Sequence, residues 1–217
     1  DVMDALWQPM YNDLLVPEIL PLAPGLVERL AGGARVADVA CGAGNGLLVL
    51  AAAFPASTFV GYDQDGAALA RGRAEAAGRG LANLTFERCD AARIPLDPPF
   101  DAVLVFNAVH DQVAPAAVLR RIHDALAPGG TFLMDEPRLS GDLEEDIANP
   151  LAPFTYAVST LHCMTVSLAA GGAGLGTAWG ERQALDLLAG AGFGPVAVHD
   201  APGDPGNAVF VTARVAG

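Results

Sequence analysis

The sequence predicts a single α/β domain in which helices cover both faces of a mostly parallel sheet. Two observations favour this fold class. Apolar segments of strand length alternate along the chain with alanine- and leucine-rich segments of helical spacing, which is the pattern of a doubly wound sheet. The chain has 217 residues, of which 52% are hydrophobic and 17% charged, so it contains enough apolar side chains for one large core. We find no internal repeat and no linker, and we expect one domain over residues 1–217.

The predicted elements fall into four consecutive segments. Residues 1–34 form a lead-in of short helices broken by prolines, and residues 35–136 form the main alternation of strands and helices. Residues 137–180 interrupt this alternation, and residues 181–217 supply a last helix and two edge strands that we expect to be antiparallel. The predicted strands are 36–39, 57–62, 84–88, 100–106, 131–134, 196–199 and 208–215, and the predicted helices after the lead-in are 47–54, 67–77, 115–126 and 181–189.

A glycine-rich bend joins the first predicted strand to a helix. Glycines at such a bend let backbone N–H groups approach a ligand closely, and the helix N-terminus adds partial positive charge. A dinucleotide site requires G-x-G-x-x-G, but the glycines here are Gly42, Gly44 and Gly46, and Leu47 occupies the place of the third glycine. Asp38 precedes Gly42 by four residues, and its carboxylate disfavours a phosphate and favours a sulfonium or an ammonium group.

Acidic residues follow the ends of three successive predicted strands. These are Asp38, Asp63 and Asp90, at intervals of 25 and 27 residues. The carboxyl ends of parallel strands lie at one edge of a sheet, where doubly wound folds bind ligands. In adenosyl-binding folds the acid that closes the second strand accepts hydrogen bonds from the ribose hydroxyls, so we expect this role for Asp63, with Gln64 beside the adenine. Asp65 is in position to cap the next helix.

These residues resemble the first motif of class I S-adenosylmethionine-dependent methyltransferases, an acidic residue followed by glycines at alternate positions. Residues 38–44 are D-V-A-C-G-A-G, so Ala40 stands where the family has its first glycine. The sequence L-x-P-G-G at 126–130 is also typical of the family. The resemblance covers residues 35–135. It implies a Rossmann-like, seven-stranded, mostly parallel sheet with an antiparallel edge strand, and S-adenosylmethionine as the cofactor.

The resemblance also implies which residues hold the cofactor. In the family, an Asp after the third strand and the next backbone N–H hold the adenine, and the matching residues here are Asp90 and Ala91. Tyr11, in the lead-in, either packs as a core aromatic or lies over the cofactor. The predicted cofactor-binding residues are Tyr11, Asp38, Ala40, Gly42, Gly44, Asp63, Gln64, Asp90, Ala91, Phe106 and Asn107.

A narrower resemblance involves the segment after the fifth strand. Residues 162–169, Leu175-Gly176 and Trp179-Gly180, with residues 110–112 upstream, look like methyltransferase-domain proteins that carry a winged-helix domain ahead of the catalytic one. The resemblance to class I methyltransferases implies that residues 137–180, an insertion after the fifth strand, build the pocket for the methyl acceptor. The sequence contains no winged helix, and it leaves open whether the protein forms a homodimer.

Four polar residues are candidates to act as the base or to bind the methyl acceptor. A hydroxyl acceptor needs a base, and His110 follows the fourth strand, near the expected methyl donor, with a pKa that a protein can tune to neutrality. Asp111 is a candidate to orient His110. Together with His110 and Asp111, His162 and Tyr156 are candidates to line the acceptor pocket. For each lone histidine, a structural role in the core is the alternative.

The composition limits the partners of the protein. The formal net charge is −13, and nucleic-acid binding requires clustered basic residues, so we expect no nucleic-acid partner. We find no apolar stretch of roughly 18 residues and no signal-peptide pattern at the start, and we expect a cytoplasmic protein without membrane contact. The three cysteines lack the spacing of a zinc site or of a disulfide framework, so we predict no metal.

The predicted function is S-adenosylmethionine-dependent methyl transfer to an oxygen or nitrogen of a small molecule, by in-line attack on the sulfonium methyl group. Two alternatives stay open. A methyltransferase-like domain that senses an adenosyl ligand without turnover is consistent with the alanine at position 40. An NAD(P)-dependent oxidoreductase would share the strand, glycine bend and helix.

Overall fold

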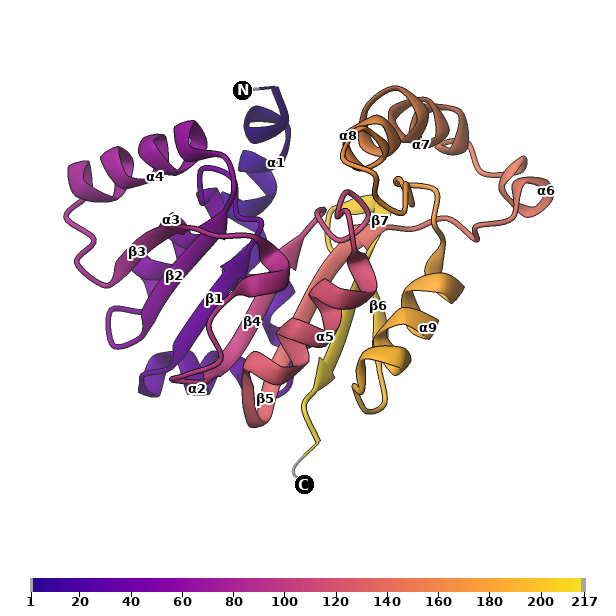
Figure 1. Cartoon of the computed structure of the whole chain (residues 1–217). Helices are drawn as coiled ribbons and strands as arrows, with labels where there is room; N and C mark the ends of the chain where they lie inside the picture. Colours follow the sequence, from indigo (N-terminus) through magenta and orange to yellow (C-terminus); the bar gives the residue numbers. More distant parts are fainter. Residues whose placement is uncertain (1, 216–217) are drawn as a thin grey trace.

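The sheet has the predicted topology. The computed structural model describes residues 2–215, with the side chains of residues 8–215. The strands of this part of the chain are β1 (Arg35–Val39), β2 (Thr58–Asp63), β3 (Leu84–Arg88), β4 (Phe100–Phe106), β5 (Leu126–Pro137), β6 (Ala197–Ala201) and β7 (Asp204–Ala213). They form one seven-stranded sheet in the order β3-β2-β1-β4-β5-β7-β6 (Figure 1). The first five strands are parallel, and β7 is antiparallel to both β5 and β6, which confirms the predicted fold class.

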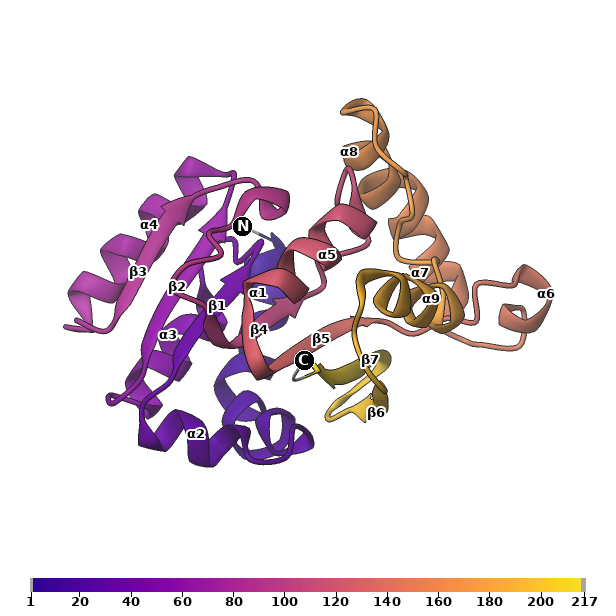
Figure 2. The ribbon, with the colours of Figure 1, turned by 60° about the horizontal axis from the view of Figure 1, so that its bottom comes forward.

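Helices pack against both faces of this sheet. One face carries the lead-in and the helices that follow β1 and β2, and the other carries α5 (Pro115–Ala125) and α9 (Glu181–Ala191). Figure 2 shows α5 and the lead-in helix α2 on opposite sides of the sheet. The helices of the first face are α1 (Val2–Asp13), η1 (Leu15–Ile19), η2 (Leu20–Leu22), α2 (Leu26–Gly32), α3 (Asn45–Ala53) and α4 (Gly66–Gly78).

Local sequence signals set several of these bounds. The Asp65 carboxylate accepts a hydrogen bond from the Ala67 N–H at 2.8 Å, so Asp65 caps α4 as predicted. Pro115 lies in the first turn of α5, where a missing N–H costs nothing. Gly192, with φ 100°, ends α9. The residues of β4 are almost all buried, as expected of a central parallel strand with helices on both sides.

Two strands are longer than the sequence predicts. β5 begins at Leu126 and not at residue 131, because Leu126 already pairs with Phe100 before the register shifts. β7 begins at Asp204 and not at residue 208, because Asn207 pairs with Pro137 of β5 and Asp204 pairs with the end of β6. The tight turn between β6 and β7 therefore lies close to the carboxyl end of β5.

The insertion, residues 137–180, stands beyond the carboxyl edge of the sheet (Figure 1). Its helical turns are α6 (Leu143–Asp146), α7 (Ala152–Val158), η4 (Ser159–Cys163) and α8 (Met164–Ala169), and η4 joins α7 to α8 without a break. A further short turn, η3 (Ala91–Arg93), follows β3. Within the described residues, we find no helix with the length and apolar character needed to span a membrane.

Candidate active site

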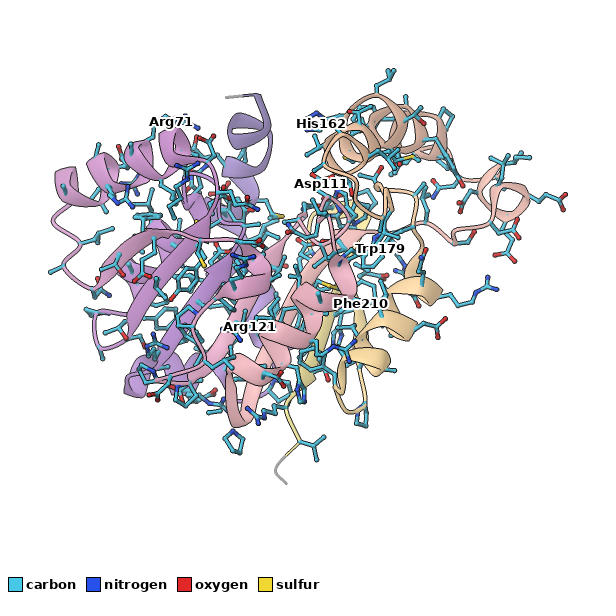
Figure 3. The ribbon with its side chains drawn as sticks, in the orientation of Figure 1. Arg71, Asp111, Arg121, His162, Trp179 and Phe210 are labelled. Atoms are coloured by element: carbon cyan, nitrogen blue, oxygen red, sulfur yellow. The ribbon has the colours of Figure 1, made fainter. Side chains whose placement is uncertain are left out.

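Three adjoining cavities lie at the carboxyl edge of the sheet, beside the ends of β1 and β4. Their volumes are about 190, 340 and 500 Å³, and we call them the small, middle and large cavities. Asn107 and Asp111 line all three, so the cavities meet at the end of β4. Figure 3 shows Asp111 at this edge of the sheet and His162 above it on the insertion. The strand order reverses between β1 and β4, which is where doubly wound folds bind ligands.

The small cavity contains a buried carboxylate. Asp38 is only 4% exposed and lines this cavity with Tyr11 and Phe106, whose rings meet edge to face at 5.3 Å. Burial, and then the negative charge of Asp63, raise the pKa of Asp38 well above its usual value. Among the described residues, no cationic side chain offsets these two effects. A positively charged ligand group in the small cavity would restore the ionised form of Asp38.

The ends of β1 and β4 share an uncommon backbone conformation. Ala40 has φ 60° and Asn107 has φ 52°, both in the left-handed region that favours glycine. Ala40 lines the small and large cavities, so its methyl group and its strained backbone both belong to the site. Asn107 is fixed by its N–H, which donates to the Asp135 carbonyl at 2.7 Å, and by its Oδ1, which accepts from Asn207 at 2.9 Å.

The large cavity joins the ends of β2, β3 and β4. Asp63, Gln64 and Ala91 line it, as the sequence predicted for residues around a nucleoside. The Asp63 carboxylate is held on both oxygens: Oδ2 accepts the Gly42 N–H and Oδ1 accepts the Asp65 N–H, each at 2.8 Å. Asp63 therefore connects the glycine bend after β1 to the end of β2.

Two predicted cofactor residues do not line these cavities. Asp90 is exposed, and its Oδ1 accepts the Ala92 N–H at 2.9 Å to cap η3, while its neighbours Cys89 and Ala91 line the large cavity. Gly44 is the residue that precedes α3, and a Cβ there would overlap the Phe86 ring. Its role is close packing under the glycine bend, because Gly42 and Gly46 line the small cavity instead.

A histidine and a glutamate form a buried pair between β4 and β5. His110 is 3% exposed, and its Nδ1 lies 2.5 Å from Oε2 of Glu136, which is fully buried. The other carboxylate oxygen, Oε1, accepts the N–H groups of Ala108 and Val109 at 3.0 and 2.7 Å. Burial lowers the pKa of His110, but the Glu136 charge and hydrogen bonds with Cys163 and Glu136 outweigh it and hold the pKa well above the ordinary value.

The second ring nitrogen of His110 faces two further groups. Nε2 lies 3.4 Å from Asp111 Oδ1, a buried oxygen without a hydrogen-bond partner in the described structure. One ligand atom each from His110, Asp111 and Cys163 lie within 4.8 Å of one another. In the described part of the chain, this is the set of side chains that could hold a metal ion, whereas we predicted none from the sequence.

The middle cavity is mostly apolar. It is lined by His110 and Asp111, by Phe154 and Val158 of α7, and by residues 204–207 at the start of β7. His162 lines this cavity and the small one, and its role beside an acceptor stays a prediction. The prediction for Tyr156 is not supported, because it is not a lining residue. Its hydroxyl donates to Asp146 Oδ2 at 2.9 Å, and its neighbours Phe154 and Thr155 take the place on the cavity wall.

The family of the chain follows from a comparison with protein-family models. The model described as "Methyltransferase domain" matches residues 30–171, which is more than half of the chain. The chain belongs to the methyltransferase domain family. The predicted resemblance is therefore confirmed for family and fold, and no finding supports the dinucleotide-dependent oxidoreductase.

The curated relatives that the chain matches are longer than the chain, which spans half of their length or less. A trans-aconitate 2-methyltransferase of Methylobacterium nodulans is 37% identical over 109 residues, which cover 50% of this chain and 40% of the relative. A solved O-methyltransferase family 2 protein from Planctomyces limnophilus, in complex with apigenin, has a TM-score of 0.72 at 19% identity and covers 99% of this chain and 61% of its own. Human N-acetylserotonin methyltransferase in complex with SAM has a TM-score of 0.65 at 18% identity. The match covers 99% of this chain and 55% of the human chain.

Sequence reasoning missed several side chains of this methyltransferase domain. Glu136 was placed at the end of a strand but received no role, although two adjacent acidic residues at the end of an apolar strand were a usable signal. Thr177, in the insertion, and residues 204–207, at the start of β7, line the middle cavity, and we gave neither of them a role from the sequence. Only the antiparallel insertion of β7 beside β5 brings residues 204–207 to the site.

Proposed function

We propose that the chain binds S-adenosylmethionine and transfers its methyl group to a hydroxyl group of a small molecule, with His110 as the general base. The observation that carries this proposal is the buried His110–Glu136 pair at the middle cavity, which meets the small cavity of Asp38 at Asn107 and Asp111. Membership of the methyltransferase domain family supports it, as does a structural neighbour solved with SAM.

The residues around the small and large cavities fit this cofactor. Asp38 supplies a buried negative charge for the positively charged methionine end, and Asp63 supplies carboxylate oxygens at the predicted ribose position. In our proposal Tyr11, Ala40, Gly42, Phe106 and Asn107 enclose the methionine end, because they line the small cavity. Gln64 and Ala91 border the adenosine, because they line the large one. Asp90 keeps its predicted adenine role only as a proposal, since its present contact is the cap of η3.

The bound cofactor supplies an activated methyl group, so the protein has to place the acceptor, exclude water and accept a proton. Glu136 holds His110 through Nδ1, which leaves Nε2 to face the middle cavity. An acceptor hydroxyl that takes the methyl group from the cofactor, with the thioether as leaving group, would give its proton to Nε2. Glu136 then stabilises the imidazolium. In this proposal Asp111 and His162 position the acceptor.

Replacing His110 with Ala tests the proposed base. Turnover of a hydroxyl acceptor should fall by roughly 10²- to 10⁴-fold, the usual contribution of a positioned base. Binding of S-adenosylhomocysteine, measured by isothermal titration calorimetry, should stay unchanged. His123→Ala is the matched control. His123 lies on α5, packs against Phe193 and lines none of the three cavities. Unaltered turnover in the His110 variant would remove it as the base.

The same assays separate the enzyme from a sensor. Binding of S-adenosylmethionine without product formation across a broad acceptor panel would identify a sensor of an adenosyl ligand. The relatives named for trans-aconitate raise a narrower question about the acceptor. Trans-aconitate is a tricarboxylate, so its use by this chain would require a cavity that receives three negative charges.

A further inference from the structure

The arginines of the chain all lie outside the middle cavity. The chain has 12 Lys and Arg residues, every one of them an arginine within the described residues, and no arginine lines the cavity. Arg138 directly follows the lining residue Pro137, but its guanidinium group pairs with Asp200 and with Glu181 at the surface. A carboxylate in this cavity would therefore lack the guanidinium or ammonium partner that such groups normally have when buried.

Apart from the two histidines, the charged side chains that line the cavity are acidic. Asp111 follows His110 in the chain, and Asp204 is the first residue of β7. Oδ1 of Asp204 accepts the Gly206 N–H at 2.9 Å, whereas Oδ2 is buried and has no hydrogen-bond partner in the described structure. A buried carboxylate oxygen without a donor is costly, so this end of the cavity is suited to a ligand that brings one.

A second buried carboxyl group lies behind this wall. Asp135 is fully buried, and its Oδ1 accepts from Asn207, which also lines the cavity. Burial raises the pKa of Asp135, and the charges of Asp204 and Glu136 raise it further, whereas the Asn207 hydrogen bond lowers it. Further negative charge is therefore unfavourable at this wall, and of the two imidazoles in the cavity His110 is already paired with Glu136.

We propose that the acceptor is a neutral or cationic molecule with an apolar body, whose methylated hydroxyl lies at His110 and whose second hydrogen-bond donor binds Asp204, and that polycarboxylates are excluded. This inference rests on the proposed methyl transfer. The apolar body contacts the aliphatic and aromatic lining of Leu151, Phe154 and Val158. A hydroxyl or ammonium group at the far end then donates to Asp204 Oδ2.

Three phenols whose para tails are of similar length but end in groups of different charge test the inference. Tyramine carries an ammonium group, 4-propylphenol is neutral and 4-hydroxyphenylacetate is anionic. Each is titrated into the full chain saturated with S-adenosylhomocysteine, and trans-aconitate is titrated as a fourth probe. Tyramine should bind at least tenfold more tightly than 4-hydroxyphenylacetate, with 4-propylphenol between them, since one unfavourable charge contact near a protein surface changes affinity by roughly ten- to a hundredfold. Trans-aconitate should not bind.

Asp204→Asn assigns the preference to one side chain. It keeps the oxygen that accepts the Gly206 N–H, and it should reduce the ratio of tyramine to 4-hydroxyphenylacetate affinity about tenfold. Asp200→Asn is the control, because Asp200 lies on the neighbouring strand β6, pairs with Arg138 and lines none of the three cavities; it should leave the ratio unchanged.

Equal or tighter binding of the anionic phenol would overturn the inference, and so would the absence of tyramine binding or an unchanged ratio in Asp204→Asn. Methylation of trans-aconitate by a chain that binds S-adenosylhomocysteine would refute this inference alone. A chain that binds neither S-adenosylmethionine nor S-adenosylhomocysteine would refute the proposed function itself.

Discussion

Ala40→Gly tests the strained backbone at the end of β1. Ala40 has φ 60°, where an L-residue with a Cβ costs about 1–2 kcal/mol and glycine costs little. Glycine also loses more chain entropy on folding, by about 0.5–1 kcal/mol. The difference predicts that the substitution stabilises the fold by about 0.5–1 kcal/mol. For a domain of this size that free energy corresponds to a rise in Tm of about 1–4 °C.

Ala43→Gly is the matched control for this stability effect. Ala43 belongs to the same bend and is buried, but it is not among the residues with positive φ. Its substitution removes a buried methyl group, worth about 0.8 kcal/mol, and it adds the same entropy cost without relieving strain. Ala43→Gly should therefore lower Tm, whereas Ala40→Gly should raise it, both measured by differential scanning calorimetry.

The cofactor affinity of Ala40→Gly provides a second measurement on the same variant. The Ala40 methyl group borders the small and large cavities, so its removal should preserve or improve binding of S-adenosylmethionine in a calorimetric titration. A fall in Tm equal to that of Ala43→Gly would show that the strain estimate is wrong. A marked loss of affinity would show that the methyl group supports the cofactor and does not crowd it.

Three further predictions concern the ribose, the base and metal ions. Asp63→Ala should weaken cofactor binding by about 1.5–3 kcal/mol, the loss of hydrogen bonds to a charged acceptor. Asp142→Ala should lower stability only, because Asp142 caps α6 and lines none of the three cavities. Equal dissociation constants for Asp63→Ala and wild type would refute the ribose role. Glu136 raises the pKa of His110, so the neutral imidazole that can act as a base forms only above that raised pKa. Glu136→Gln should therefore move the rise of kcat with pH to lower pH and reduce the plateau of kcat roughly tenfold or more. An unchanged pH profile would show that Glu136 does not act on the base. A chelator should leave kcat unchanged. Added Zn²⁺ should inhibit, because a metal bound to Nε2 of His110 occupies the lone pair with which the base accepts the proton. Turnover that a chelator removes and Zn²⁺ restores would instead show that these side chains form a metal centre.

The His110–Glu136 pair makes the stability of the fold depend on pH, and the sign of this dependence can be predicted. Because the pKa of His110 is raised on folding, the protonated pair contributes its full stability below the unfolded pKa of about 6.5. That contribution is lost as the pH rises through the raised pKa in the folded protein. The loss should be smaller in Glu136→Gln, which lacks the carboxylate charge.

The order of strands and helices was predictable because it depends on local patterns. The continuous apolar run of β4 and the proline at the start of α5 are visible in the sequence itself. The edge at which Asp38, Asp63 and His110 meet was predictable for a related reason. Parallel strands place their carboxyl ends together, so side chains far apart in sequence share one edge.

The remaining parts of the site depend on long-range contacts that periodicity does not encode. Glu136 meets His110 across 26 residues, through the register of two adjacent strands. Tyr156 and Thr155 are neighbours on α7, and the rotation of that helix against the sheet decides which of them reaches the cavity. The role of Asp90 was open for a different reason, because one carboxylate both caps a short turn and resembles a ligand-binding acid.

The wall of the middle cavity has an evolutionary consequence. Phe154 and Val158 on α7, Thr177, and Pro205 and Gly206 at the start of β7 border this cavity and neither of the other two. Under the proposed function, mutations at these positions would change which acceptors fit and leave the cofactor-binding residues unchanged. Descendants of one ancestral gene could then acquire new substrates by changes in one helix, one loop residue and the first residues of one strand, and laboratory selection for a new substrate can be confined to the same codons.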